Sequence, residues 1–313
     1  MAERMAGASH TRALGELRAA DSSSFGGKSA SLGELIGAGL PVPPGFAIST
    51  DAGERMSDDL RDEIAARCAE LGRGEGGGDG PSLAVRSSAL GEDSAEATFA
   101  GQQDTFLWVR GVDAVCDAVQ RCWASLHSAG AVAYREHLGP GAARVAMGVT
   151  VQAMVDAAIA GVMFTCNPVT GDPSMIAINA SWGLGLAVVG GEVTPDDHLI
   201  SKVTGEVVRE TITDKEVEYV PDSSGSGTVR RAVDPDRRTA RCLDADALRE
   251  LVALGRRIER HFGSHQDVEW AYDRDGCLYV LQSRPVTGLP ERAPAPPAGS
   301  ALSMVMKTFG AGG

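Results

Sequence analysis

Paired cysteines, long apolar runs and positive charge are all scarce in this sequence. Its six cysteines are scattered without any C-x-x-C pair, which favours reduced, buried thiols over disulfides or a zinc site. The longest apolar region, residues 145–164, is interrupted by Thr150, Gln152 and Asp156, so we expect no membrane span. Lysine and arginine number 29 against 42 acidic residues, and the formal charge of −13 argues against nucleic acid or an anionic membrane as partner.

What the sequence does contain is typical of a soluble globular protein. Residues 1–20 are charged and lack a signal-peptide pattern, so we expect a cytoplasmic location. With 313 residues and 43% hydrophobic content, the chain can bury a sizeable core divided between two lobes or domains. Among the histidines, only His261 and His265 stand four residues apart, and Gly263 between them should end the helix, so a zinc site is not expected.

The pattern of apolar residues and turn signals predicts a mixture of helices and largely antiparallel strands, which is an α+β fold. We expect a loose lead-in over residues 1–20 and a folded region over 21–288. A Pro/Ala-rich linker and a short tail should occupy 289–313. In that tail Leu302, Val305, Met306 and Phe309 have helical spacing; a frayed end is the simpler interpretation, and a docking helix for a partner is the alternative.

Within the folded region several elements can be placed from their local patterns. A Gly-Gly pair should open a helix over 25–38, and Asp244 should cap a second helix that runs to about residue 262. Residues 82–87 form a predicted strand, residues 145–155 and 161–165 look like a pair of strands, and residues 205–220 look like a hairpin.

The most informative stretch is a predicted hairpin over residues 266–285. With Asp275 and Gly276 at its tip, Arg274 should face Cys277, because Asp-Gly is a favoured two-residue turn. The same register places Glu269 opposite Gln282, and Asp267 opposite Arg284. Side chains that alternate along paired strands share a face, so two carboxylates, an amide and a guanidinium should converge.

Two interpretations of this converging cluster remain open from the hairpin alone. Hard oxygen ligands together with an arginine suit Mg²⁺ and a transferring phosphoryl group. The alternative is an ordinary surface ladder with one Asp–Arg ion pair, which would contribute little to function or stability.

Other segments could also bind phosphate. The segment SFGGKS around Lys28 nearly matches a phosphate-binding P-loop, but Ser22 stands where the first glycine is required, so a P-loop enzyme is not expected. A lysine at a glycine-freed helix start still favours phosphate, although it could simply be solvated. Arg86 ends an apolar run and needs either a structural carboxylate or a ligand phosphate. The WGLG segment lacks a third glycine at Val188, so a dinucleotide fold is not expected.

Taken in order, the motifs resemble the ATP-binding domain shared by phosphoenolpyruvate synthase, pyruvate phosphate dikinase and rifampicin phosphotransferase. The resemblance runs from about Ser24 to Thr287. It rests on the segments GGKSASLGEL, GLPVPPGFAI, AVRSSALGED, FAGQQDTFL, VQAMV, AGVMFTCNPVTGD, ASWGLG, GEVTPD, HFG, QDVEWA and LQSRPVT.

This resemblance implies an ATP-grasp-like two-lobe fold that uses ATP and Mg²⁺ for phosphoryl transfer. The implied catalytic residues are Lys28, Arg86 and Arg284, with Arg284 at the transferring group. The implied ligands of Mg²⁺ are Glu269 and Gln282. The nucleotide-contacting set adds a loop over the phosphates (Thr98, Gly101 and Gln102), an adenine pocket (Gln152, Met154 and Val155) and Asp267 near the ribose and phosphates.

The chain departs from the family pattern in ways that bear on its activity. Leu186 stands where relatives usually carry glutamate after WGLG, and Gly190 where many carry serine, which could weaken nucleotide binding or mark a subfamily. Full-length relatives continue into a swivelling domain with a phosphorylated histidine and then an acceptor-binding domain. No histidine of this chain lies in such a motif, so we expect these parts on a separate domain or subunit; a non-catalytic ATP-binding module or a detached fragment is the alternative.

Overall fold

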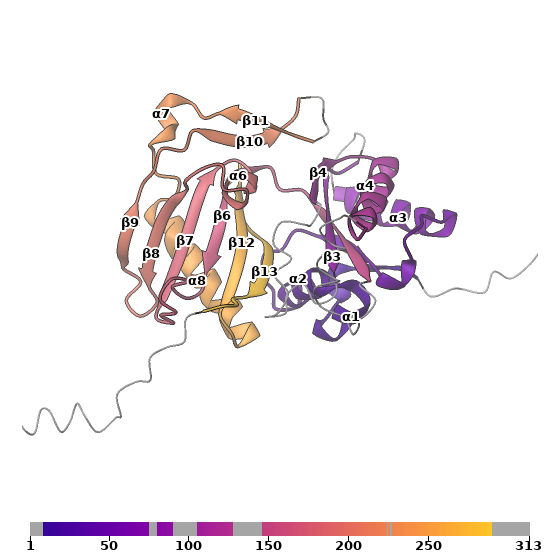
Figure 1. The fold of residues 1–313 in the computed structure, drawn as a ribbon, viewed down its shortest axis with the longest axis horizontal. Coiled ribbons are helices and arrows are strands. Elements are labelled where there is room, and N and C mark those ends of the chain that lie inside the picture. The colour runs from indigo at the N-terminus through magenta and orange to yellow at the C-terminus, as the bar shows by residue number, and fades with distance from the viewer. Residues whose placement is uncertain are drawn as a thin grey trace, which may run out of the picture.

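The computed structural model describes residues 9–74, 80–89, 105–127 and 146–289, with Ser224 and Ser226 excepted, and arranges them in two lobes (Figure 1). The first lobe is built on a five-stranded antiparallel sheet of order β1-β2-β5-β3-β4. Its strands are β1 (Thr11–Ala13), β2 (Gly45–Ile48), β3 (Leu83–Ala89), β4 (Thr105–Val109) and β5 (Met147–Ala153). Its helices are α1 (Ser22–Phe25), α2 (Gly27–Gly37), α3 (Asp58–Leu71) and α4 (Val112–Ser125), with short 3-10 turns η1 (Leu14–Glu16), η2 (Ala19–Asp21), η3 (Thr50–Ala52) and η4 (Gly72–Gly74).

Alternation along β5 explains how helices cover both faces of this sheet. Val149 and Val151 are fully buried in a cluster with residues of α3 and α4. Thr150 points to the other face, where its hydroxyl lies 2.7 Å from that of Ser29 in α2. Because successive side chains of a strand point to opposite faces, β5 contacts α3 and α4 on one face of the sheet and α2 on the other.

The second lobe is a six-stranded antiparallel sheet of order β13-β12-β6-β7-β8-β9. Its strands are β6 (Ala157–Phe164), β7 (Met175–Trp182), β8 (Asp196–Ser201), β9 (Val207–Thr211), β12 (Gln266–Asp273) and β13 (Leu278–Pro285). A separate hairpin of β10 (Val217–Pro221) and β11 (Thr228–Ala232) runs above the sheet toward the first lobe (Figure 1). The remaining helices are α6 (Leu186–Val189), α7 (Pro235–Arg238) and α8 (Ala245–Phe262).

Helix α8 covers one face of the second sheet, and its two ends follow the expected capping chemistry. Asp244 accepts hydrogen bonds from the backbone amides of Asp246 and Ala247, and Gly263 ends the helix in the left-handed conformation, with φ of 67°. The buried side of α8 packs on Val268 and Trp270 of β12, which are both fully buried. Within the described ranges, no helix is long and apolar enough to cross a membrane.

Two expected strand pairings are wrong. Residues 145–155 and 161–165 do not pair with each other: β5 lies in the first sheet and β6 in the second, and residues 154–156 connect the lobes. Residues 205–220 do not form one hairpin either, because β9 pairs with β8 and β10 pairs with β11.

The expected loose lead-in is also wrong for the part that the structure describes. Residues 11–13 form β1, which pairs with β2, and Leu14 and Leu17 are fully buried. These two leucines share a core cluster with Leu32 and Leu35 of α2. Residues 9–20 therefore belong to the folded unit, because apolar side chains placed next to α2 bury more surface there than in a solvated tail.

Several contacts fasten the first lobe to the free edge of β13. The Val280 amide donates to the Pro41 carbonyl at 2.8 Å, and the Ser31 hydroxyl of α2 donates to the Ser283 carbonyl at 2.7 Å. Contacts of this kind cover an edge strand that would otherwise expose unpaired backbone groups. The edge of β13 is thus where the two lobes join.

Candidate functional site between the lobes

The β12–β13 hairpin presents one apolar face and one polar face, as its alternation predicts. Glu269 pairs with Gln282, and Asp267 pairs with Arg284, so the predicted register of these four residues is confirmed. Their side chains lie on the face opposite to buried Trp270. Two adjacent strands therefore fix an amide, a guanidinium and two carboxylates on one rigid surface.

The turn of this hairpin differs from the prediction, and a bulge corrects the register. The prediction pairs Arg274 with Cys277, whereas the structure pairs Tyr272 with Leu278. The pairing near the turn is therefore shifted by one residue from the predicted register. Farther along, Trp270 pairs with Val280 but Glu269 pairs with Gln282, which leaves Leu281 as an extra residue of β13. The bulge cancels the shift at the turn, which is why the predicted pairs beyond it hold.

Asp267 and Arg284 form an ion pair at the end of the polar face. The Nε and Nη2 atoms of Arg284 lie 2.9 and 2.8 Å from Oδ2 of Asp267. The Asp267 side chain is only 12% exposed, and this burial raises the pKa of its carboxyl group. The charge and hydrogen bond of Arg284 lower the pKa, and the nearby charge of Glu269 raises it further. The Arg284 side chain is 48% exposed, so a ligand can approach it from solvent.

Arg86 of β3 reaches this face from the first lobe. Its Nη1 atom donates to the Leu281 carbonyl at 3.1 Å and lies 3.9 Å from Oε2 of Glu269. A bulge displaces a carbonyl from regular pairing, so it can present one to an approaching side chain. The buried Nε of Arg86 has no partner among the described residues. A buried guanidinium donor without an acceptor is unfavourable unless a ligand supplies one, which leaves room for an anion here.

Lys28 lies on the same side as Arg86, near the start of α2. Lys28 is 8% exposed, and its ammonium donates to the Ser87 carbonyl at 3.1 Å. The Ser88 hydroxyl near the start of α2 is buried without a partner in the described part of the chain, whereas the Ser87 side chain points to the opposite face of β3. Gly26, just before α2, has a φ of 82°, and a Cβ there would lie 2.2 Å from the Ser88 hydroxyl oxygen. Only glycine permits α2 to begin this close to the end of β3.

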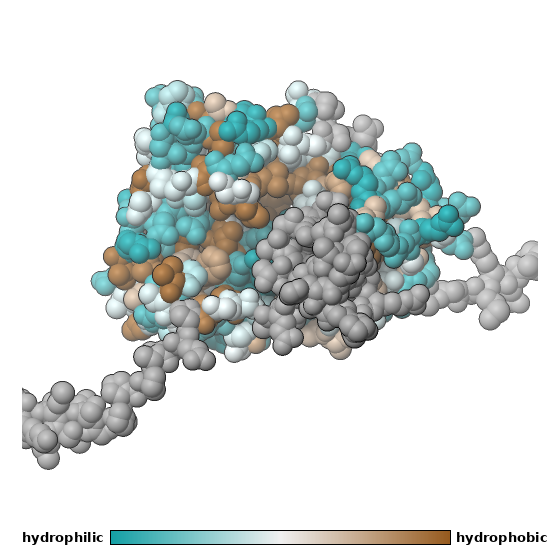
Figure 2. Space-filling model, viewed as in Figure 1, coloured by the Kyte–Doolittle hydropathy of each residue, from teal (hydrophilic) through white to brown (hydrophobic). Residues whose placement is uncertain are grey.

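The predicted adenine pocket is brought to the lobe junction only in part. Gln152 is 1% exposed and its amide donates to the Pro43 carbonyl at 3.1 Å, so this side chain supports the first lobe from inside. Met154 and Val155 lie in the connection between the lobes and belong to an apolar cluster with Leu184 and Leu281. On the face shown in Figure 2, hydrophobic residues gather where the two lobes meet.

Some site predictions cannot be placed. Thr98, Gly101 and Gln102, the expected loop over the phosphates, lie outside the described residues, as does the tail with Leu302 to Phe309. Among the residues that the structure does describe, no group of three or more His, Cys, Asp or Glu side chains could hold a metal ion. The Glu269–Gln282 pair nevertheless fits Mg²⁺, which commonly uses one or two protein oxygen ligands and completes its shell with phosphates and water.

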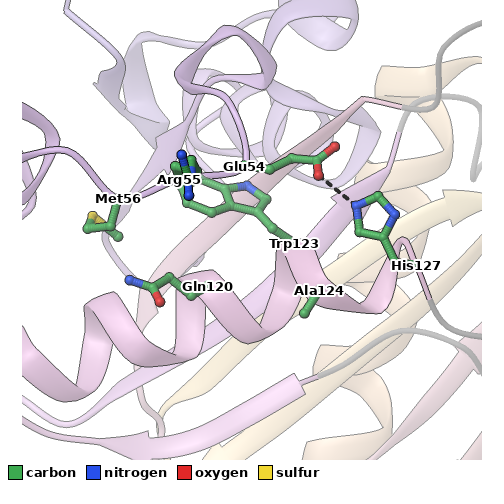
Figure 3. Close-up of a pocket in the computed structure, with 7 residues that line it drawn as sticks. All are labelled: Glu54, Arg55, Met56, Gln120, Trp123, Ala124 and His127. Atoms are coloured by element: carbon green, nitrogen blue, oxygen red, sulfur yellow. Dashed lines mark hydrogen bonds and ion pairs between the residues drawn. The ribbon is translucent and has the colours of Figure 1, made fainter.

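A separate pocket lies on the first lobe, away from this face. Its volume is about 460 Å³, and its lining comes from residues 54–56 after η3, from α4 and from His127 just beyond α4 (Figure 3). The lining includes Arg55, Trp123 and an ion pair of His127 with Glu54 at 2.6 Å. None of the predicted site residues lines it.

The sequence-based prediction missed the Leu281 carbonyl and the Ser88 hydroxyl. Ser88 follows Arg86 by two residues in AVRSSA, so it shares a strand face with the guanidinium and could have been identified from alternation. The local sequence does not predict the bulge at Leu281, because the bulge depends on how β13 packs against its neighbours.

Two lobes with facing cationic and carboxylate surfaces define a candidate site for an anionic, metal-bound ligand. Residues 52–301 match the family model for the pyruvate phosphate dikinase AMP/ATP-binding domain, and the chain belongs to this family.

Curated relatives agree with this assignment. A probable phosphoenolpyruvate synthase of Methanothermobacter thermautotrophicus is 42% identical over 85% of this chain and 44% of its own length. A rifampicin phosphotransferase of a Streptomyces species is 40% identical over 89% of this chain and 36% of its own length. The chain thus spans less than half the length of either relative.

A solved structure is also similar, at low identity. The crystal structure of PH1788 from Pyrococcus horikoshii Ot3 is 13% identical, with a TM-score of 0.41, and the match covers 88% of this chain and 97% of that one. The two-lobed α+β architecture of the chain itself confirms the expected fold class.

Proposed function

We propose that the chain is the ATP-binding module of a dikinase-type phosphotransferase, which uses Mg–ATP to phosphorylate a histidine on a separate domain or subunit. The observation that carries this proposal is the approach of Arg86 from the first lobe to within 3.9 Å of Glu269 on the second. Cationic and carboxylate groups then face each other across the lobe junction, where a metal-bound polyphosphate would be neutralised from both sides.

The residues divide the work of binding and charge neutralisation. Lys28 and Arg86, with the buried Ser88 hydroxyl on the same face of β3, would hold phosphate oxygens from the first lobe. Glu269 and Gln282 would hold Mg²⁺, which when bound supplies positive charge at the phosphate oxygens.

Arg284 would neutralise the phosphoryl group that is transferred. Asp267 holds its guanidinium through two contacts to one oxygen, which fixes the orientation of the arginine before ATP binds. Phosphoryl transfer needs little covalent chemistry from the protein, so positioned charges of this kind are the main contribution that this module can make.

The histidine that accepts the phosphate would come from outside the site. We expect a histidine-bearing swivelling domain or subunit and an acceptor-binding domain as partners. Support comes from the relatives, whose length extends well beyond the matched region. The final acceptor would be chosen by those other parts of the enzyme.

The test is phosphate transfer from ATP labelled in its β-phosphate, with Mg²⁺, by the full chain mixed with a lysate of its native host. An acid-labile, alkali-stable label on a second polypeptide, with AMP and phosphate as products, is the expected result. The same reaction with Glu269→Ala should give no label, because the variant loses a metal ligand. Binding of ATP without any transfer would instead support a non-catalytic nucleotide-binding module.

A further inference from the structure

Trp108 of β4 occupies an unusual backbone conformation at the lobe junction. Val109 pairs with Leu83 and Phe106 with Val85, so Leu107 and Trp108 together oppose Ala84 in a bulge. Trp108 has a φ of 57°, and no other non-glycine residue in the described part of the chain has a positive φ. Such a conformation is costly for a bulky side chain and is often retained where a side chain must be aimed at a functional site.

The surroundings of Trp108 place it beside the connection between the lobes. It is 8% exposed and shares an apolar cluster with Val155, Leu184 and Leu281, which come from the connection and from the second lobe. Its carbonyl also accepts a hydrogen bond from the Gly227 amide, in the loop between β10 and β11, at 3.4 Å. The tryptophan is therefore a first-lobe residue surrounded mainly by second-lobe elements.

The indole N–H of Trp108 is buried and has no acceptor among the described residues. Buried indole donors usually find a partner, because an unmade hydrogen bond costs free energy. The indole N–H groups of Trp123 and Trp270 also lack an acceptor there, but Trp123 lies in the core formed with α3 and α4, and Trp270 lies in the cluster that α8 covers. Of the three, Trp108 alone shares a cluster with Met154 and Val155 of the connection between the lobes.

We propose that Trp108 is a specificity-determining residue for the nucleoside part of the ligand: its indole N–H donates to a ring nitrogen at the edge of the base. This inference rests on the proposed function, since it assumes a nucleotide at the lobe junction. The side chains of Met154, Val155 and Leu281 give the base an apolar surface. Lys28 lies near the start of α2 and Arg284 near the end of β13, and Arg86, which donates to the Leu281 carbonyl, marks the boundary between the base and the phosphates. The phosphates and the nucleoside would then be recognised by separate groups of residues.

The experiment compares Trp108→Phe with the matched variant Trp123→Phe in the full chain. Both substitutions keep an aromatic ring and remove one buried, unpartnered N–H, but Trp123 lies beside the pocket of Figure 3, on the first lobe. We expect Trp108→Phe to weaken ATP binding about three- to tenfold, the effect of one lost hydrogen bond. Inorganic tripolyphosphate, which has no base, should bind both variants as it binds the wild type. Equal ATP affinity in the two variants would overturn the proposal.

A measurement on the wild type guards against a folding defect in the variant. The chain has four tryptophans, so its ¹⁵N-indole spectrum contains few signals, and the Trp108 signal follows by elimination from Trp123→Phe, Trp182→Phe and Trp270→Phe. ATP should shift the Trp108 indole proton, and tripolyphosphate should leave it in place. An unmoved signal with bound ATP would overturn the role of Trp108 alone. Failure of the wild type to bind ATP would overturn the proposed function as well.

Discussion

The two walls of the site are built in opposite ways. On the second lobe, the β12–β13 hairpin supplies Asp267 and Arg284 as a pair that is already satisfied internally. On the first lobe, the corner between α2 and β3 leaves the Arg86 Nε and the Ser88 hydroxyl buried without partners among the described residues. A wall of satisfied groups is rigid before any ligand arrives, whereas unsatisfied donors gain hydrogen bonds when an anion binds. Under the proposed function, the first lobe would supply binding energy and the second would supply orientation.

The largest expected effect comes from removing the oriented cation of the second wall. Arg284→Ala should lower phosphotransfer by about a thousandfold or more, since arginines at a transferring phosphoryl group have effects of this size. ATP affinity should change much less, because the first wall is intact. The rate of label transfer and the dissociation constant of ATP, measured separately, test this split.

Arg274→Ala is the matched control for that prediction. Arg274 lies in the turn of the same hairpin and pairs with Asp156 at 2.8 Å, at the end away from Asp267. The variant should transfer phosphate at nearly the wild-type rate. If Arg274→Ala and Arg284→Ala lost activity alike, the hairpin would matter as a whole and the role given to Arg284 would be wrong.

The next largest effect is on the free energy of unfolding and concerns the first wall, where α2 approaches β3. Gly26→Ala should destabilise the fold by about 2–5 kcal/mol, since its φ is unfavourable for alanine and the added Cβ would collide with Ser88. Gly39→Ala, also at positive φ but with open space around it, should cost only about 1 kcal/mol. Urea unfolding of both variants gives the comparison; equal losses would mean that the close approach of α2 to β3 is not required.

The smallest effect is a pH dependence at Asp267. Its folded pKa is raised, so the charged carboxylate destabilises the fold above that pKa, and the penalty declines as the pH falls toward the unfolded value near 3.8. Asp267→Asn should therefore be more stable than the wild type at pH 7, and the difference should shrink at about pH 4. Thermal unfolding at both pH values tests the sign. A wild type more stable than the variant at pH 7 would contradict it.

Predictability from the sequence differs between the two walls. The register of Glu269 with Gln282 could be predicted, because alternation and a nearby turn are local properties. The approach of α2 to Ser88 and the separation of β5 from β6 could not, since both depend on contacts between segments far apart in the chain. The bulge at Leu281 could not be predicted from local sequence either. The predicted pairs of Glu269 and Asp267 are correct only because this bulge cancels the one-residue error at the turn.

The burial of Leu14, Leu17 and α2 in one cluster with α8 and the second sheet has a consequence for how the molecule unfolds. The N-terminal residues that lead into the first lobe complete the apolar core of the second, so neither lobe encloses all of its own hydrophobic surface. Separating the two halves of the chain at residues 154–156 would expose that shared surface on both. The two lobes are therefore a single cooperative unit, in which nucleotide bound to either wall would raise the melting temperature of both together.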